Sequence, residues 1–328
     1  MKPKIGVIIN KPLRENLFDE VAWRRLHDIG EVMATDAAEP VSRPEAMEIL
    51  RDCDIAVGSW WAPPPSAELL SVAPALRLWE HVGGSVKHFF AEDWGGRELT
   101  VASCKGAIAE SVAEMVVGEL IVGLRQIIPN AHANRLGAAD RPANLKILSA
   151  SRVAVIGASE VGKAVMERLR PFGCEIALYD PYIKSGDAAR LGARLVPDLV
   201  ELCRQADAVT LHTPALPSTR GLLGRDHFQA MRDDAIFINT SRGECLDEAA
   251  LAGELAKGRL WAFLDVSSPE PAAADSPLRK LPNVYYTSHL AGPAAHNMGH
   301  RAVADIEAFL SGKPPQCVVT RDMLERIA

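Results

Sequence analysis

The chain has 328 residues, 48% of them hydrophobic and 24% charged, with a formal net charge of −6. This length suggests about two domains, each large enough to bury a core of its own. The modest negative charge gives no electrostatic reason to expect nucleic acid or an anionic membrane as a partner. The six cysteines lack a C-x-x-C pair and metal-ligand spacing. We therefore expect reduced thiols in a cytoplasmic protein, and no metal site.

The first hundred residues alternate short apolar runs with helical patterns. Strands are expected at residues 4–9, 31–35, 54–59, 76–82 and 99–103, with helices such as 21–29 and 44–51 between them. This alternation predicts a parallel sheet with helical crossovers, and hence a small α/β domain. Gly83, Gly84 and Ser85 follow one strand, where backbone N–H groups can bind an anion. Trp60 and Trp61 follow another, where they either line a pocket or anchor their loop by apolar packing.

An apolar segment at residues 109–128 is expected to form a long helix that is buried on most of its faces. Glu114, Glu119 and Arg125 interrupt the apolar run, so the segment is not expected to span a membrane. Its excess apolar surface suggests a protein partner. A polar connection at residues 130–144 then leads into the second domain.

The stretch 153–180 predicts a strand, a turn, a helix and a second strand that ends at Asp180. The turn from Gly157 to Gly162, which includes Ser159, Glu160 and Val161, opens the helix, and helix N-termini favour a pyrophosphate. Asp180 is placed to accept hydrogen bonds from an adenosine ribose, which favours NAD over NADP. The pattern G-x-G-x-x-G has glycine where this chain has Ser159, so an ordinary tight turn is the alternative.

Strands are also expected at residues 208–213, 235–240, 262–266 and 284–288, which would complete a doubly wound sheet, and a helix from Gly292 to about Leu310 follows. Arg242, Glu270 and His289 come shortly after three of these strands. Because ligands bind at the carboxyl ends of parallel strands, the three side chains are expected at one edge of the sheet. Taken singly, each could be structural: an arginine in an ion pair, an acid in a proline turn or a histidine bonded to a carbonyl.

Together these three residues have a definite chemistry. A guanidinium can bind a carboxylate and a carbonyl oxygen in one geometry. A histidine can give a proton to the oxygen that becomes charged as hydride arrives, and a neighbouring carboxylate stabilises its imidazolium form. Such a site would reduce a 2-keto acid.

The segments that carry these residues resemble a known family. NTSRGE (239–244), LDVSSPEP (264–271), TSHLAG (287–292) and GASEVG (157–162) are similar to motifs of the D-isomer-specific 2-hydroxyacid dehydrogenases, as are KGAIAESVAE (105–114) and FLSGKPP (309–315). The resemblance implies two Rossmann/flavodoxin-like α/β domains with doubly wound parallel sheets. It places a discontinuous substrate domain at 1–104 plus 292–328, an NAD-binding domain at 105–291, and a homodimer that forms through the long helix.

The resemblance also implies roles for particular residues. Arg242, Glu270 and His289 match the family's catalytic triad and would act on a 2-keto or D-2-hydroxy acid. Substrate would also meet Trp60, Gly83, Gly84 and Ser85. The implied cofactor contacts are Gly157, Ser159, Glu160, Val161, Gly162, Asp180, His212, Thr213, Pro214, Thr219, Thr240, Ser241, Asp265 and Gly292.

Three positions depart from the family's usual pattern. Ser159 replaces a glycine, Lys87 stands where an acid is usual, and Ser288 stands where proline usually precedes the histidine. Formate dehydrogenases of this fold usually pair their histidine with glutamine, so Glu270 favours a hydroxyacid substrate. The alternative function is an NAD(H)-sensing protein with little turnover, similar to the C-terminal-binding corepressors.

Overall fold

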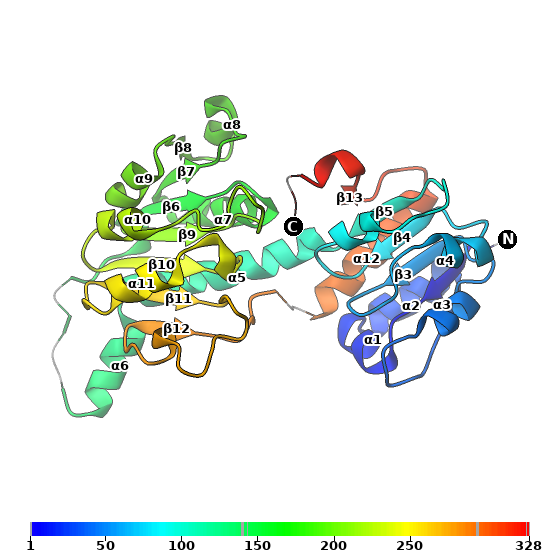
Figure 1. Ribbon diagram of the computed structural model, residues 1–328, viewed down its shortest axis with the longest axis horizontal. Helices are drawn as coiled ribbons and strands as arrows, with labels where there is room; N and C mark the ends of the chain where they lie inside the picture. Colours follow the sequence, from blue (N-terminus) through cyan, green and yellow to red (C-terminus); the bar gives the residue numbers. More distant parts are fainter. Residues whose placement is uncertain (1, 139–140, 143, 293–294, 326, 328) are drawn as a thin grey trace. The chain divides into compact units, whose positions relative to one another are not determined.

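The computed structural model describes residues 2–138, 141–142, 144–292, 295–325 and 327. The chain divides into two compact units, Met1–Ile108 with Pro293–Ala328, and Ala109–Gly292. The division falls within helix α5 (Lys105–Leu124) (Figure 1). Among the described residues, no helix is both long enough and apolar enough to cross a membrane.

The first unit is built on a six-stranded sheet in the order β13-β5-β4-β3-β1-β2. Its strands are β1 (Lys4–Val7), β2 (Glu31–Ala34), β3 (Ile55–Gly58), β4 (Leu78–His81), β5 (Thr100–Ser103) and β13 (Val318–Val319). The five strands from the amino-terminal part are parallel, as the sequence predicts, and have the flavodoxin-like order. The two-residue β13 pairs antiparallel with β5, and so short a strand leaves no periodic signal in the sequence.

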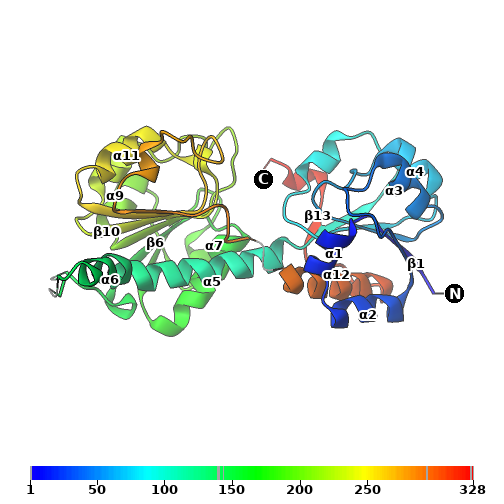
Figure 2. The ribbon, with the colours of Figure 1, turned by 90° about the horizontal axis from the view of Figure 1, so that it is seen from below.

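Helices cover both faces of this sheet (Figure 2). They are α1 (Lys11–Leu17), α2 (Glu20–Ile29), α3 (Arg43–Ile49), α4 (Ala67–Val72) and α12 (Ala295–Leu310), with 3₁₀-helices η1 (Lys87–Ala91) and η6 (Arg321–Met323). Ile5, Val7 and Ile55 pack in a core that includes residues of α1, α2 and α12, whereas Ile8 and Ala56 pack with α3 and α4. Because both faces are covered, β3 is wholly apolar and every residue of β4 is buried, including its two polar residues Glu80 and His81.

The second unit contains a seven-stranded parallel sheet in the order β12-β11-β10-β9-β6-β7-β8. The strands are β6 (Arg152–Ile156), β7 (Glu175–Tyr179), β8 (Arg194–Leu195), β9 (Ala208–Leu211), β10 (Ala235–Asn239), β11 (Leu260–Leu264) and β12 (Val284–Tyr286). The chain starts in the middle, runs outward through β7 and β8, and returns to β9 on the other side of β6. This is the Rossmann order, and its reversal lies between β6 and β9. The doubly wound α/β fold expected from the sequence is confirmed.

Helices lie on both faces of the sheet of the second unit (Figure 2). The helices of this unit are α6 (Ile127–Arg135), α7 (Glu160–Leu169), α8 (Ser185–Arg190), α9 (Leu199–Gln205), α10 (Arg225–Ala230) and α11 (Glu248–Leu255), with 3₁₀-helices η2 (Leu148–Ala150), η3 (Arg170–Phe172), η4 (Gly243–Cys245) and η5 (Pro277–Arg279). Helix α6 has no buried residue and extends away from the sheet (Figure 1). One core joins α9, α10 and α11 to side chains such as Ile156 and Phe237. On the opposite face α5 packs closely, because a Cβ on Gly123 would lie 2.7 Å from the Ile236 side chain.

Two expectations for the segment after α5 are wrong. The long helix does not run unbroken to residue 128, because Gln126 adopts a left-handed conformation (φ 49°) and a separate helix α6 begins at Ile127. Helix α6 in turn occupies Asn130–Arg135, part of the expected polar connection. Helix α6 is easily taken for a loop because Pro129, Asn130 and Asn134 have low helix propensity and the segment lacks an apolar stripe.

Candidate active site

The turn between β6 and α7 has the geometry of an anion-binding helix start. Gly157 has φ +96°, and a Cβ there would lie 2.9 Å from the carbonyl oxygen of His212. A Cβ on Gly162 would lie 2.0 Å from the Gly157 carbonyl oxygen. Both positions therefore require glycine. Ser159 has extended backbone (φ −62°, ψ 177°), which any residue adopts, and its hydroxyl accepts a hydrogen bond from the Gly162 N–H at 3.3 Å. The serine thus caps α7, and Glu160 and Val161 begin the helix.

Asp180 lies directly after β7 and is held beside this turn. Its Oδ2 accepts a hydrogen bond from the Ala158 N–H at 2.8 Å, and its Oδ1 accepts one from the Tyr182 N–H at 2.8 Å. These bonds fix the orientation of the carboxylate, and each oxygen keeps further acceptor capacity. A carboxylate held between the turn and its own loop fits the ribose hydroxyls of an adenine dinucleotide.

Buried polar atoms without protein partners gather after β9 and β10. Within the described part of the chain, His212 Nδ1, Thr213 Oγ1 and Thr240 Oγ1 have no hydrogen-bond partner although each atom is buried. Burial lowers the pKa of His212 to about 3, so the imidazole is neutral, and its Nε2 lies 2.9 Å from Thr210 Oγ1. Buried polar atoms are normally bonded, so this row fits a polar ligand such as a dinucleotide at the carboxyl edge of the sheet.

The loop after β9 closes on itself. The hydroxyl of Thr219 donates to the Pro214 carbonyl oxygen and accepts from the Leu216 N–H at 2.9 Å. The sequence suggested Pro214 and Thr219 as cofactor contacts. In the structure, the Thr219 hydroxyl stabilises the turn that carries them.

Asp265, at the end of β11, organises the loop that carries His289. Its buried carboxylate accepts hydrogen bonds from the Thr287 hydroxyl at 2.6 Å and from the backbone N–H groups of Leu290 and Ala291 at 2.7 and 2.9 Å. Its carbonyl oxygen accepts one from the His289 N–H at 2.9 Å. The sequence suggested a cofactor contact here and did not indicate this anchoring role. Gly292 ends the anchored segment.

His289 and Glu270 form the closest ionisable pair at this edge. His289 has a left-handed backbone (φ +57°), and its Nδ1 lies 2.6 Å from Glu270 Oε1. The carboxylate can only accept a hydrogen bond, so Nδ1 carries a proton and Nε2 is left to face a ligand. Both side chains remain partly exposed, at 45% and 37%. A non-glycine residue at positive φ is strained, and strain at a residue that also pairs with a carboxylate supports a functional role for His289.

Arg242 follows β10 and is positioned by Asn239. The Asn239 side-chain oxygen accepts from the Ser241 N–H at 3.0 Å and from its hydroxyl at 2.9 Å, while its Nδ2 donates to the Arg242 carbonyl oxygen at 3.1 Å. The guanidinium is exposed and donates to the Ser241 carbonyl oxygen at 2.7 Å. Gly243 then packs directly on the next loop, because a Cβ there would lie 2.1 Å from the Ser267 carbonyl carbon. The loops of Arg242 and Glu270 are therefore in contact.

Glu119, on α5, belongs to the same neighbourhood and was not indicated by the sequence as a site residue. Its side chain is buried, and its Oε2 has no partner among the described residues. Burial, and secondarily the charge of Asp265, raise the pKa of Glu119 to about 8. Near neutral pH the residue is a neutral acid beside the carboxylate that anchors the His289 loop.

The candidate substrate loop belongs to the first unit. Gly83 lies against His81, because a Cβ there would come 2.4 Å from His81 Nε2. His81 is buried, which lowers its pKa to about 3, so the neutral ring supports the loop from below. Gly84 and Ser85 follow, and Ser85 is exposed. The loop therefore packs on the buried His81 ring, and its glycines leave the backbone uncovered by side chains of their own.

The tryptophan loop is joined to this substrate loop. The Val82 N–H donates to the Gly58 carbonyl oxygen at 2.8 Å, and the Ser59 hydroxyl donates to the Val82 carbonyl oxygen at 2.6 Å. Trp60 and Trp61, which come next, are 36% and 74% exposed. The ring of Trp61 is therefore largely free of packing, whereas most of the surface of Trp60 is covered.

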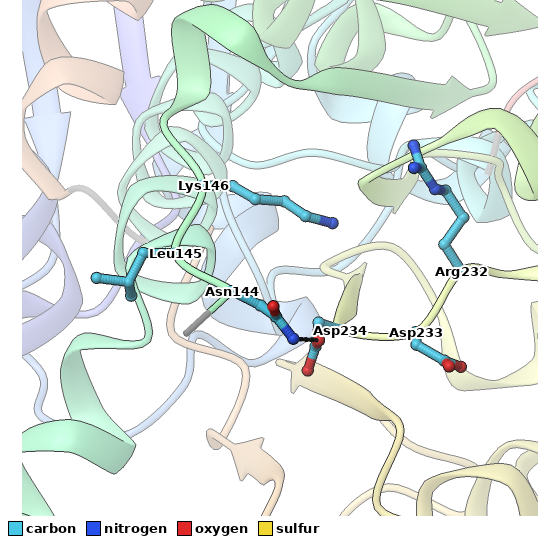
Figure 3. A pocket seen from close by; sticks show the side chains of 6 residues that line it. All are labelled: Asn144, Leu145, Lys146, Arg232, Asp233 and Asp234. Carbon is cyan, nitrogen blue, oxygen red and sulfur yellow. Dashed lines mark hydrogen bonds between the residues drawn. The ribbon is translucent and has the colours of Figure 1, made fainter. Parts of the chain in front are cut away.

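A shallow charged pocket lies near the amino ends of the strands of the second sheet, opposite the carboxyl ends that carry the candidate site (Figure 3). It is lined by Asn144, Leu145, Lys146, Arg232, Asp233 and Asp234. Residues 232–234 precede β10, so the pocket is at the amino ends of the strands. Lys146 and Arg232 both pair with Asp207, at 2.9 and 3.2 Å, and Asn144 donates to Asp234 at 2.7 Å. These partners tie the chain segment after α6 to the sheet, so we read this pocket as structural.

Comparison with known proteins agrees with this geometry. Residues 117–291 match the family model described as D-isomer specific 2-hydroxyacid dehydrogenase, NAD binding domain. The chain belongs to this family. It is 33% identical over 288 residues to a D-3-phosphoglycerate dehydrogenase of Methanocaldococcus jannaschii, covering 87% of this chain and 53% of that protein.

Other relatives match over their full length. A glyoxylate reductase of Korarchaeum cryptofilum is 28% identical over 340 residues, which cover 99% of this chain and 98% of that protein. A crystal structure of a phosphoglycerate oxidoreductase from Rhizobium etli superposes with a TM-score of 0.81 at 25% identity, covering 98% and 99% of the two chains. By contrast, the chain spans about half the length of the phosphoglycerate dehydrogenase relatives that it matches.

Proposed function

We propose that the protein is an NAD(H)-dependent oxidoreductase that interconverts a 2-keto acid and the D-2-hydroxy acid. The observation that carries this proposal is the 2.6 Å contact between His289 Nδ1 and Glu270 Oε1, beside Arg242 at the carboxyl edge of a Rossmann sheet. Membership of the dehydrogenase family supports it. In this proposal the second unit binds cofactor and the first unit binds substrate.

Each residue of the triad has a distinct part. His289 gives a proton from Nε2 to the substrate oxygen during reduction and takes it back during oxidation. Glu270 holds the imidazole by Nδ1 and stabilises its charged form. Arg242 binds the substrate carboxylate and polarises the carbonyl through its planar set of donors. Bound NADH supplies the hydride.

We propose NAD rather than NADP as the preferred cofactor. Asp180 would accept hydrogen bonds from the ribose hydroxyls, whereas a 2′-phosphate would meet its negative charge. The unpartnered atoms of His212, Thr213 and Thr240 would meet polar groups of the same cofactor. Ser241 and Gly292 lie in the loops that flank this edge.

The proposed substrate is a small carboxylic acid whose carboxylate is bound by backbone N–H groups of residues 83–85. Trp60, on the adjoining loop, would contact the remainder of the substrate. Relatives named for phosphoglycerate and for glyoxylate mark out a range of 2-hydroxy and 2-keto acids to test. We further propose that the protein is a homodimer that forms through α5, whose Met115, Val117 and Ile121 are only half-buried.

Turnover of NADH with a panel of keto acids tests the function. The panel contains glyoxylate, hydroxypyruvate, phenylpyruvate and sugar-derived 2-keto acids, together with 3-phosphoglycerate and NAD in the opposite direction. We expect turnover with at least one substrate, lowered about 100-fold or more in His289→Asn, with NADH binding retained. Arg242→Gln should raise the KM for the keto acid most strongly.

Two outcomes would contradict this function. Normal turnover by both variants would exclude the proposed triad. Silence of the wild-type protein across the panel, with NADH binding demonstrated, would favour the NAD(H)-sensing alternative. In that case a change of oligomeric state on adding NADH is the next measurement.

A further inference from the structure

The loop that carries Glu270 is closed by a chain of hydrogen bonds to Tyr286. The Ser267 hydroxyl donates to the Pro269 carbonyl oxygen at 2.8 Å and lies 2.9 Å from the Tyr286 phenol oxygen. The same phenol oxygen accepts a hydrogen bond from the Ala272 N–H at 3.1 Å. The bonded groups stand immediately before and shortly after Glu270 in the chain, so one phenol joins both sides of the loop.

The direction of this chain of hydrogen bonds follows from the number of protons. Ser267 has one hydroxyl proton, which goes to the Pro269 carbonyl, so between the two hydroxyls Tyr286 is the donor. The lone pairs of Tyr286 then remain for the Ala272 N–H. Each donor in this series of hydrogen bonds has one acceptor, so removal of the Ser267 or the Tyr286 hydroxyl leaves one of its partners without a hydrogen bond.

Other contacts hold the two ends of the Glu270 loop, so the turn between them is held by the hydrogen bonds to Ser267 and Tyr286. The Ser268 N–H donates to Glu248 Oε1 at 2.6 Å on the entry side. On the exit side, Arg279 donates to the Ala272 carbonyl oxygen at 2.8 Å, and its guanidinium lies 5.2 Å from the Tyr286 ring centroid. Pro269 and Pro271 lack N–H groups, so they cannot fix the turn by backbone donation.

We propose that Tyr286 and Ser267 are positioning residues: they form a hydroxyl clip that holds the Glu270 loop in the conformation in which its carboxylate meets His289. This proposal rests on the function proposed above. Ser267 is 4% exposed, and Tyr286 comes from β12, which directly precedes the His289 loop. The clip therefore couples the two loops that contribute the carboxylate and the imidazole.

Removal of one oxygen atom tests the clip. Tyr286→Phe keeps the ring against Arg279 and deletes only the phenol oxygen. We expect kcat for keto acid reduction to fall about tenfold, with the KM for NADH changed by less than about twofold, because general acid catalysis depends on the orientation of the imidazole. The fall of activity with rising pH should move to lower pH, since Glu270 then stabilises the imidazolium less well.

Tyr285→Phe is the matched control. Tyr285 neighbours Tyr286 in the same strand, but its side chain points to the opposite face and stacks on Trp261, with ring centroids 6.4 Å apart. We expect this variant to keep wild-type kinetics. Ser267→Ala should reproduce the effect of Tyr286→Phe, Ser267→Thr should restore most of the activity, and the double variant should lose no more than either single variant.

Hydrogen exchange at the Ala272 amide gives a second measurement that needs no turnover. Exchange should be faster in Tyr286→Phe than in the wild type or in Tyr285→Phe. Unchanged amide exchange and unchanged kinetics in Tyr286→Phe would overturn the proposed clip. It would also be overturned if the fold-losses in kcat of Tyr286→Phe and Ser267→Ala multiplied in the double variant, because the two hydroxyls would then act independently. If exchange depends on Tyr286 but the wild type turns over no keto acid, the proposed function fails, and with it the catalytic part of the clip.

Discussion

Glu119 provides a test of how burial controls charge beneath the site. Its pKa is raised from the ordinary value of 4.5 to about 8, mainly by burial and secondarily by the charge of Asp265. Between these two values the folded protein keeps a proton that the unfolded chain releases. The free energy of unfolding therefore falls as pH rises through this range, because the folded state binds more protons.

The size of the effect follows from the same two values. Each pH unit inside the range changes the free energy of unfolding by up to about 1.4 kcal/mol. From about pH 5 to about pH 7 the wild type should thus lose up to about 2.5 kcal/mol relative to Glu119→Gln, which cannot ionise. Relaxation of the folded protein around the charge would reduce this figure toward about 1 kcal/mol.

Urea unfolding of both proteins at several pH values measures the difference. Glu114→Gln is the matched control, because Glu114 lies on the same helix but is exposed. We expect the Glu119→Gln variant to gain stability over wild type as pH rises, while Glu114→Gln follows wild type within about 0.5 kcal/mol. A Glu119→Gln difference that is constant with pH would refute the assignment of a neutral buried acid.

Three further predictions concern the site. Asp180→Asn should lower the NADH over NADPH preference in kcat/KM by about tenfold or more, since repulsion of a 2′-phosphate is removed; an unchanged ratio would show that Asp180 does not select the cofactor. Keto acid reduction should decline as pH rises and the His289 imidazolium loses its proton, and Glu270→Gln should move that decline to lower pH; a flat profile with chemistry rate-limiting would remove His289 as the acid. Gly243→Ala should lower the free energy of unfolding in urea by about 1–3 kcal/mol and also lower turnover, because the added Cβ overlaps the neighbouring loop. Gly253→Ala is the control: its Cβ would lie in open space on α11, so neither quantity should fall.

The outline of the fold could be predicted from the sequence because its signals are local. Apolar runs that alternate with helical patterns indicate parallel strands, and the runs at residues 4–9, 153–156 and 235–240 all coincide with strands of the structure to within two residues at either end. The order of the strands follows from the general handedness and switch-point rules of such sheets. Short elements such as β8 and β13 escaped prediction, since two residues carry no period.

Parts of the site were also within reach of the sequence. Arg242, Glu270 and His289 could be expected at one edge, because residues that follow parallel strands share that edge. The residues that support this triad could not be predicted from the sequence. Nothing local indicates that Asp265 would bind three donors from the His289 loop, or that Glu119 on a distant helix would lie near it.

The sequence by itself therefore determined the class of fold, the family resemblance and the candidate reacting groups, because these depend on residue type and spacing along the chain. Only the tertiary structure decided which atoms meet. It brought His289 to within 2.6 Å of Glu270, turned Ser159 into a helix cap, and joined Tyr286 to both sides of the Glu270 loop. The physical reason is that hydrogen bonds and desolvation act over a few ångströms in space, between residues that the chain order leaves unconnected.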